Sequence, residues 1–515
     1  MKLIRPLKIF LKPPDRWILP LALFVSSLIF FASLISKGPY HVDTLNLVIQ
    51  AQETLRDRQL HFLFGFGYPF TVLLAAGFVW IGERAGAGDP VLAVNAMSVL
   101  FGALTVMLTY CLGRALFNTL AGVVSALVLS VSPIFLGLSV HGQSQTPGLC
   151  FLMAGMCFLI RDHAGRQGKS LFLSALLLGL AGATRLQDAC LMSAALLFLF
   201  LVPPGTSRPD EQRPAPAVFP RLLFWAGTGL AVAVAFHAPF LLQENRDVYL
   251  NQLHRFWTAG LTDNYRGVAS SQLLLSGVYL VKSMTEVGAL LSFLGLLALA
   301  RRRWRVAVFF LLWVAVPVLF YGNLNTTSTS RFFVLVLPPL CLALGYCFSA
   351  LVRKGKAFRF AGFVVLAVIL SLMVQYMLPK ARFRHTTAAL PEYCRWVGRV
   401  TEPGALIITG DEALFMIFYS GRETLVRPRS LEFLPEAQIE AFQDIVEEVL
   451  SGGRPVYITA PALYSHDKER HFSGALGAAF RFIPVGQHIY EDWHLGPMTL
   501  QVHRFALYKI EKKYL

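Results

Sequence analysis

Eleven runs of mostly apolar residues, separated by short polar segments, constrain the fold of this chain more than any other feature. A helix needs about 20 apolar residues to cross the hydrocarbon core of a bilayer. The sequence therefore predicts a polytopic α-helical membrane protein with about eleven transmembrane helices. The predicted spans are residues 17–36, 93–112, 121–140, 147–161, 171–187, 188–203, 221–242, 284–300, 306–322, 332–352 and 360–379.

The composition excludes a water-soluble fold as the starting class. The chain is 55% hydrophobic and 15% charged, whereas soluble proteins carry about 25% charged residues. The net charge of +16 could suggest nucleic-acid binding, but the basic residues form short clusters between the apolar runs. Such clusters are typical of membrane topology, so the predicted partner is the lipid bilayer and not a nucleic acid.

The distribution of basic residues predicts the orientation. Alternate loops are richer in lysine and arginine, which places the N-terminus in the cytoplasm and the C-terminus outside. The first span follows several basic residues and has no small-residue cleavage site, so we expect it to be retained. The basic residues of the predicted cytoplasmic loops are Arg114, Arg161, Arg166, Lys169, Arg208, Arg213, Arg221, Arg301, Arg302, Arg303, Arg305, Arg353, Lys354, Lys356 and Arg359.

Two further segments of the membrane part have distinct compositions. Residues 68–82 are apolar but too short for a span, which favours a re-entrant or interfacial helix. Residues 203–220 contain six prolines and are expected to form a stiff cytoplasmic linker. The predicted outer loops that could contribute to a site are 37–92, 243–283 and 323–331.

The composition changes near residue 379, which divides the chain into a membrane domain, 1–379, and a soluble extracytoplasmic α/β domain, 380–515. Residues 405–409 and 455–459 have the pattern of short buried strands, and residues 435–450 that of a helix ended by Gly452 and Gly453. Only Cys394 lies in this domain, so no disulfide framework can form there.

Acidic and amide residues follow the first predicted span. Asp43, Asn46, Gln50, Glu53 and Asp57 are spaced three or four apart, which forms one polar stripe on a helix. Most of these side chains are expected to be a solvated face of an interfacial helix. Asp43 differs because it lies close to the end of a span, at the boundary between water and lipid. A charged group at that depth is costly and usually has a function.

Five short motifs in the membrane part resemble, in their order and spacing, the GT-C superfamily of polyprenyl-phosphate-sugar-dependent glycosyltransferases. This superfamily includes the protein O-mannosyltransferases and the lipid A aminoarabinose transferases. The motifs are Tyr40–Asp43, Gly67–Phe70, Asn95 with Tyr110–Phe117, Thr184–Arg185, and Ser330–Phe333 followed by Pro338 and Pro339.

The resemblance implies a hexosyl- or pentosyltransferase in the inner membrane of a bacterium. It would move a sugar, with inversion, from a polyprenyl-phosphate donor to the hydroxyl of a lipid, glycan or protein acceptor outside the membrane. This chemistry needs a base near the hydroxyl and cations around the leaving phosphate. Asp43 is the candidate base. Candidate donor-phosphate ligands are Arg331, Arg185 and Lys282, and candidate acceptor ligands are Tyr68, Gln143, Arg255 and Arg266.

Each basic candidate also has a structural explanation. A lysine or arginine at a helix end can extend its charged group to the lipid headgroups without taking part in chemistry. Asp188 follows Arg185 closely enough to pair with it, and such a pair could orient the guanidinium.

The sequence departs from the common form of the superfamily in two places. Asp43 is followed by Thr44 and not by a second acid, and residues 141–147 lack the acid that is frequent at the outer end of the third span. Hard divalent cations prefer carboxylate oxygens. We therefore expect no cofactor and a metal-independent transfer, although the sequence alone leaves a divalent metal open.

Two other functions were weighed against this one. An O-antigen ligase or polymerase also has many spans, but usually concentrates its functional residues in one late loop, whereas the acids here lie in an early loop. A secondary transporter should show two matching halves with broken helices and charged residues at mid-membrane. The sequence shows neither feature, so the transporter is the weaker alternative.

Overall fold

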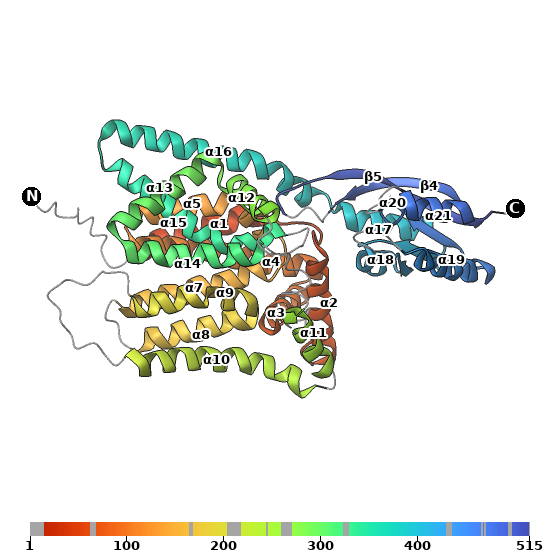
Figure 1. Cartoon of the computed structure of the whole chain (residues 1–515), viewed down its shortest axis with the longest axis horizontal. Helices are drawn as coiled ribbons and strands as arrows, with labels where there is room; N and C mark the ends of the chain where they lie inside the picture. The colour runs from red at the N-terminus through yellow and green to blue at the C-terminus, as the bar shows by residue number, and fades with distance from the viewer. Residues whose placement is uncertain are drawn as a thin grey trace, which may run out of the picture. The chain divides into compact units, whose positions relative to one another are not determined.

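A computed structural model describes residues 15–61, 68–163, 168–202, 218–243, 246–258, 270–322, 329–428, 435–464, 467, 470–492 and 497–513. The chain forms two compact units (Figure 1). The first contains Met1–Ile35, Leu47–Arg382 and Gly496–Met498, and the second contains Ser36–Asn46, Phe383–Leu495 and Thr499–Leu515.

The first unit is helical, and a helix lies at each of the eleven predicted spans. Its elements are α1 (Asp15–Ala32), α2 (Val42–Asp57, whose first turn belongs to the second unit), α3 (Pro69–Arg84), α4 (Pro90–Leu116), α5 (Thr119–Val131), α6 (Pro133–Ser139), α7 (Gln145–His163), α8 (Lys169–Thr184), α9 (Leu186–Leu201), α10 (Val218–Leu242), α11 (Arg246–Thr258), α12 (Ser270–Met284), α13 (Glu286–Arg302), α14 (Trp304–Tyr321), the 3₁₀ helix η1 (Thr329–Val336), α15 (Leu337–Val352) and α16 (Lys356–Thr386, whose last turn belongs to the second unit).

Within the described residues, five helices are long and apolar enough to cross a membrane, or seven if two bent pairs each count as one span. The bent pairs are α5 with α6, at 68°, and α12 with α13, at 101°. The first bend precedes Pro133, whose ring cannot continue the hydrogen-bond ladder of α5. The structure thus shows a helical membrane protein with five to seven candidate spans, and the number eleven stays a prediction.

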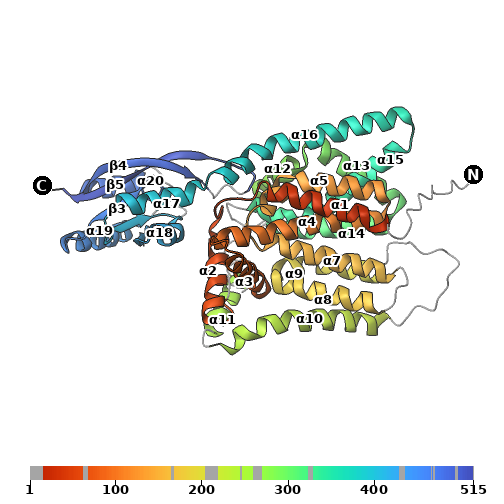
Figure 2. The ribbon, with the colours of Figure 1, turned by 180° about the vertical axis from the view of Figure 1, so that it is seen from behind.

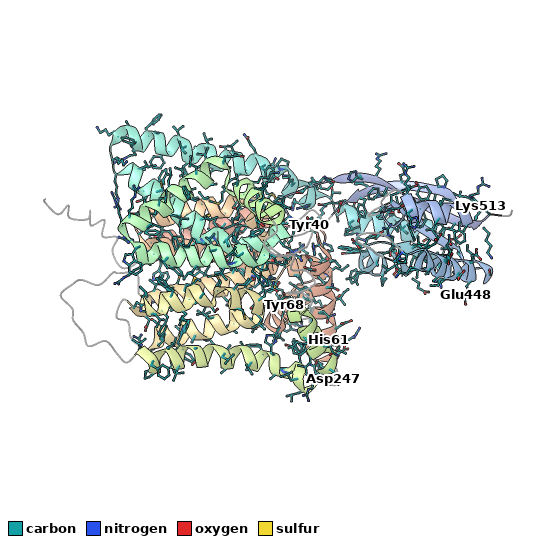
Figure 3. The ribbon with its side chains drawn as sticks, viewed as in Figure 1. Tyr40, His61, Tyr68, Asp247, Glu448 and Lys513 are labelled. Atoms are coloured by element: carbon teal, nitrogen blue, oxygen red, sulfur yellow. The ribbon has the colours of Figure 1, made fainter. Side chains whose placement is uncertain are left out.

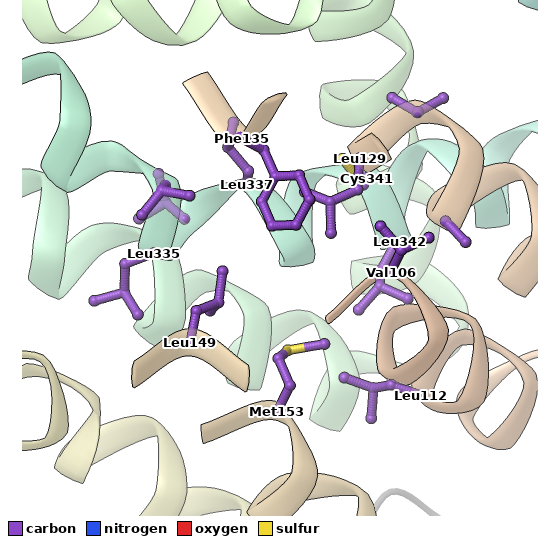
Figure 4. Packing of buried hydrophobic residues seen from close by; sticks show 14 of the residues in the cluster. Val106, Leu112, Leu129, Phe135, Leu149, Met153, Leu335, Leu337, Cys341 and Leu342 are labelled. Atoms are coloured by element: carbon purple, nitrogen blue, oxygen red, sulfur yellow. The ribbon is translucent and has the colours of Figure 1, made fainter. Parts of the chain in front are cut away.

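Apolar side chains from distant parts of the sequence form the core of the first unit (Figure 4). Phe135, Met153 and Leu342 are fully buried there. Helices α7, α8 and α10 lie side by side in both views (Figures 1 and 2). Helices α4 and α5 approach closely where Gly113 faces Gly122, because neither residue has a side chain. A Cβ added at Gly113 would lie only 2.7 Å from the Cα of Gly122.

The predicted interfacial segment 68–82 is helical, as α3. One of its faces, which includes Val72, Ala75 and Val79, is buried in a cluster with residues of α2 and α4. Its depth in the membrane stays a prediction.

The second unit contains a five-stranded mixed sheet in the order β2-β1-β3-β5-β4. Strands β1, β2 and β3 are parallel, and β5 is antiparallel to both β3 and β4. This arrangement confirms the predicted α/β class, and both predicted strands and the predicted helix are present. The elements are α17 (Ala389–Val400), β1 (Leu406–Thr409), α18 (Ala413–Ser420), β2 (Glu423–Val426), α19 (Glu436–Ser451), β3 (Val456–Thr459), α20 (Ala460–Tyr464), α21 (His471–Ala479), β4 (Phe480–Glu491) and β5 (Val502–Lys512).

Candidate functional site

Arg185 lies at the break between α8 and α9, and its side chain is buried. Its Nε donates to Oδ2 of Asp188 at 2.6 Å, and its Nη2 reaches Oδ1 of the same carboxylate at 3.4 Å. Its Nη1 donates to the Ser144 hydroxyl at 2.7 Å. Asp188 is in the first turn of α9, where the helix N-terminus stabilises a negative charge. The guanidinium is therefore held from two sides.

The carboxylate that holds Arg185 is itself fixed by a third helix. Tyr321, the last residue of α14, donates its hydroxyl to Oδ1 of Asp188 at 2.5 Å. Tyr321 is 1% exposed. Hydrogen bonds to a charged group in a low-dielectric interior are strong. We call Arg185, Asp188, Ser144 and Tyr321 the arginine network.

Arg331 comes close to this network through one phenyl ring. The Cζ of Arg331 lies 5.0 Å from the centre of the Phe332 ring, and the Cζ of Arg185 lies 5.9 Å from it. The same ring stacks on Tyr321 with 4.8 Å between centres. The structure thus brings together the two arginines predicted to bind phosphate, around Phe332 in η1. Two guanidiniums against one carboxylate leave a net positive charge.

Tyr68, a candidate acceptor ligand, lies at the start of α3 (Figure 3). Its backbone is left-handed, with φ of 44°, which is uncommon for a residue with a side chain. The hydroxyl donates to Gln187 at 3.1 Å, and the Cζ of Arg185 lies 5.5 Å from the ring centre. Tyr68 is therefore a neighbour of the arginine network.

The loop before α7 packs tightly on α4. The backbone N–H of Gly142 donates to Asn95 at 2.7 Å, and a Cβ at Gly142 would lie 2.5 Å from a methyl group of Val94. The candidate acceptor ligand Gln143 binds Ser98 through its backbone N–H at 3.1 Å. The Oε1 atom of Gln143 is buried and has no hydrogen-bond partner within the described part of the chain.

Gly148, in the first turn of α7, has no side chain and so leaves space for the side chain of Arg185. A Cβ at this position would lie 3.0 Å from Cδ of Arg185. The sequence motif around Thr184–Arg185 thus depends on a glycine from another helix.

The remaining basic candidates are not part of the arginine network. Lys282 is exposed in the last turn of α12, and no contact joins it to the network among the residues described. Arg255 is on α11, but its side chain lies outside the described residues, as does the whole of Arg266.

Asp43 is in the first turn of α2 and belongs to the second unit. Its side chain is 21% exposed, and its Oδ1 lies 3.4 Å from Nδ1 of His41. The same nitrogen accepts the backbone N–H of Asp43 at 3.0 Å, which favours the tautomer of His41 with its proton on Nε2. In that tautomer His41 is neutral.

No group of three His, Cys, Asp or Glu side chains that could hold a metal ion occurs among the described residues. Within residues 141–147, which lack an acid, Ser144 binds the same guanidinium as Asp188.

Sequence reasoning did not identify Tyr321, Ser144 or Phe332 as site residues. Tyr321 ends an apolar run, where aromatic residues commonly mark the membrane interface, so nothing in the sequence distinguished its role. Asp188 could be found because it is three residues from Arg185.

Part of the helical unit matches a known protein family. Residues 73–218 match the family described as dolichyl-phosphate-mannose-protein mannosyltransferase. The comparison with curated protein sequences gives no match.

Among solved structures, the chain is similar to ArnT from Cupriavidus metallidurans bound to undecaprenyl phosphate, with 13% identity, a TM-score of 0.58, and 97% of this chain and 98% of that chain covered. It is also similar to the oligosaccharyltransferase of Archaeoglobus fulgidus tethered with an acceptor peptide, with 12% identity, a TM-score of 0.54, and coverage of 94% and 74%. The mycobacterial arabinofuranosyltransferase AftD shares the fold at 15% identity and a TM-score of 0.53, over 95% of this chain and 40% of that chain.

The shared fold and the family match over residues 73–218 agree with the resemblance to polyprenyl-phosphate-sugar-dependent glycosyltransferases seen in the sequence.

Proposed function

We propose that this enzyme transfers a sugar, with inversion at the anomeric carbon, from a polyprenyl phosphate to an acceptor hydroxyl on the outer side of a bacterial inner membrane. Asp43 would take the proton of the acceptor hydroxyl as that oxygen attacks the sugar. The phosphate would leave with the electron pair of the glycosidic bond. The soluble domain, residues 380–515, would lie outside, and the N-terminus inside.

The arginine network supplies the stabilisation that the leaving phosphate needs. A guanidinium has five N–H donors, and three of those on Arg185 bind Asp188 and Ser144. Nη1 and Nη2 each keep one further N–H, which suits two oxygens of one phosphate. Because Asp188 and Tyr321 already fix the guanidinium, little reorganisation is required as charge develops.

Arg331 would supply the second positive charge. It lies near the same Phe332 ring and is more exposed than Arg185, so it would approach the phosphate as the bond breaks. Lys282 would contribute only at longer range. Tyr68, Gln143, Arg255 and Arg266 remain the proposed acceptor ligands.

The observation that carries this proposal is the convergence of Arg185 and Arg331 on Phe332, with Arg185 fixed by a buried carboxylate. A carboxylate that can act as a base and two cations near the phosphate are the groups that an inverting transfer from a lipid phosphate requires.

The test uses a strain in which the gene is deleted and then restored as wild type, Asp43→Asn or Glu53→Gln. Asparagine keeps the size of the side chain but cannot accept the proton, so transfer should fall by about 10²–10⁴-fold. Lipid-linked sugars and cell-envelope glycans are profiled by mass spectrometry. The Asp43→Asn strain should accumulate the same polyprenyl-phosphate sugar as the deletion strain.

Glu53→Gln is the matched control because Glu53 lies on the same polar stripe of α2 and its side chain is 31% exposed. It should restore the wild-type profile. A wild-type profile in the Asp43→Asn strain would show that Asp43 is only a surface acid.

A further inference from the structure

The segment that carries Asp43 is built into the second unit. Residues Ser36–Asn46 belong to this unit although the rest of it begins only at Phe383. The backbone N–H of Lys37 donates to the carbonyl of Arg384 at 3.1 Å, and its ammonium donates to the carbonyl of Thr386 at 3.1 Å. We call Ser36–Asn46 the anchored segment.

The centre of this attachment is a buried arginine. The Cζ of Arg384 lies 3.7 Å from the centre of the Tyr40 ring, and both side chains are buried. The Nε of Arg384 pairs with Glu491 at 2.6 Å, and its Nη2 donates to the carbonyl of Thr499 at 2.7 Å. A buried cation requires such partners. A cation–π contact is stronger when the pair is shielded from water.

Close packing adds to these polar contacts. A Cβ at Gly38 would lie 3.1 Å from Cβ of Ala388 and 3.1 Å from Cγ of Pro391, which is tighter than ordinary contact. The anchored segment therefore lies directly on the start of α17.

Only two residues separate Tyr40 from Asp43, and both are structured. His41 is buried and accepts the backbone N–H of Asp43, and α2 begins at Val42. The position of the Asp43 carboxylate relative to Arg384 is thus determined by a short, ordered stretch of chain.

We infer that the second unit positions the catalytic base. Tyr40, Arg384 and Glu491 are positioning residues: they hold the anchored segment so that Asp43 meets the acceptor hydroxyl in a productive geometry. This inference rests on the proposed role of Asp43. It gives the soluble domain a part in the chemistry, beyond any part in recognising the acceptor.

The kinetic test compares Tyr40→Leu, Tyr40→Phe and Glu491→Gln with wild type in the purified full-length enzyme. A misplacement of about 1 Å can cost roughly 10²-fold in rate. Tyr40→Leu removes the ring face from Arg384 and should lower kcat by about 10- to 100-fold while KM for the lipid donor stays within about twofold. Tyr40→Phe keeps the ring and should retain kcat within about threefold. The kcat of Glu491→Gln should lie between those of Tyr40→Leu and Tyr40→Phe.

Arg427→Gln is the matched control for a general loss of stability. Arg427 is also a buried arginine of the second unit, with its Nη1 on the carbonyl of Ala462 at 2.6 Å and its Cζ 5.0 Å from the centre of the Phe472 ring. It makes no contact with the anchored segment among the described residues. Its replacement should lower the melting temperature but leave kcat of the folded enzyme unchanged.

A second experiment tests the attachment without an activity assay. Gly38→Cys combined with Ala388→Cys places two Cβ atoms close enough for a disulfide after a small adjustment. Mild oxidation should link them in the native enzyme, as a shift in peptide mapping, and each single variant should not link.

The outcomes separate the two hypotheses. If Asp43→Asn is inactive but Tyr40→Leu keeps the wild-type kcat, the positioning role is wrong and the proposed base stands. If Asp43→Asn keeps full turnover, the proposed base is wrong and the positioning role falls with it. If Gly38→Cys with Ala388→Cys fails to link, the attachment itself is refuted.

Discussion

Asp188 accepts hydrogen bonds from Arg185 and Tyr321 inside the first unit, at 2.6 Å and 2.5 Å. A buried ion pair pays a large desolvation cost and often adds little stability compared with apolar packing. The hydrogen bonds from Tyr321 to Asp188 and from Arg185 to Ser144 hold both members of this pair, so its geometry is well defined. We interpret the arginine network as a device for positioning one guanidinium.

Tyr321→Phe should impair transfer without unfolding the enzyme. The change removes only the hydroxyl that holds Oδ1 of Asp188, so Arg185 keeps its partner but loses part of its orientation. We expect kcat to fall by about 5- to 50-fold, which corresponds to about 1–2.3 kcal/mol at the transition state. Steady-state kinetics with saturating lipid donor measure the change.

Tyr346→Phe is the control for this prediction. Tyr346 is a half-buried tyrosine of α15 whose ring is tilted by 44° against that of Phe117, and its hydroxyl has no hydrogen bond within the described part of the chain. It should behave as wild type. Equal kcat for both variants and wild type would exclude a role for the Tyr321 hydroxyl.

Asp188→Asn should destabilise the first unit strongly. The change leaves the buried charge of Arg185 without a counter-ion, and breaking one side of a buried pair costs about 3–5 kcal/mol. The melting temperature in detergent should fall, and adding Arg185→Gln to the same chain should recover part of the loss. A melting temperature unchanged by Asp188→Asn would mean that water reaches Arg185.

Arg331→Lys decides whether Arg331 binds phosphate or only anchors η1 in the headgroup layer. Lysine keeps the charge but cannot present two parallel N–H donors to a phosphate. We expect at least a tenfold loss of kcat for Arg331→Lys and a larger loss for Arg331→Ala. If the lysine variant matched wild type at saturating donor, Arg331 would be removed from the site.

Chelation should leave the activity unchanged. Of the two carboxylates in the proposed site, Asp43 is followed by Thr44 and not by a second acid, and the oxygens of Asp188 already bind Arg185 and Tyr321. Hard cations require several oxygen ligands. Transfer measured with and without EDTA, after dialysis, should agree within about twofold. Loss of activity with EDTA that Mg²⁺ or Mn²⁺ restores would contradict the metal-independent mechanism.

The sequence predicted the helices and the α/β class of the second unit, because each depends on local patterns. It also singled out Arg185 and Arg331, which lie near one ring, while their roles stay predictions. Apolar length predicts a helix whatever its neighbours are. The role of Tyr321 depends on the distance between α14 and α9, which no local pattern contains. For the same reason the attachment of Tyr40 to Arg384 could not be predicted: it joins residues from opposite ends of the chain.

The membrane orientation is the prediction on which every outer-side role depends. We expect residues 43 and 464 to face the outside and residues 208 and 213 to face the cytoplasm, because the basic clusters lie in the loops that alternate with them. Single cysteines at these four positions are tested with a membrane-impermeant thiol reagent on intact cells, and again after permeabilisation.

Labelling of two native cysteines, Cys394 and Cys190, must be low for this experiment. Burial raises the pKa of the Cys394 thiol well above its usual range, and the nearby carboxylate of Glu412 raises it further, so Cys394 should stay protonated and unreactive. Cys190 is exposed on α9 and is replaced by serine. Tyr464→Cys, at a side chain that is 53% exposed, should label from outside, and Arg208→Cys should label only after permeabilisation. Labelling of Arg208→Cys on intact cells would invert the topology and remove Asp43 from the outer side.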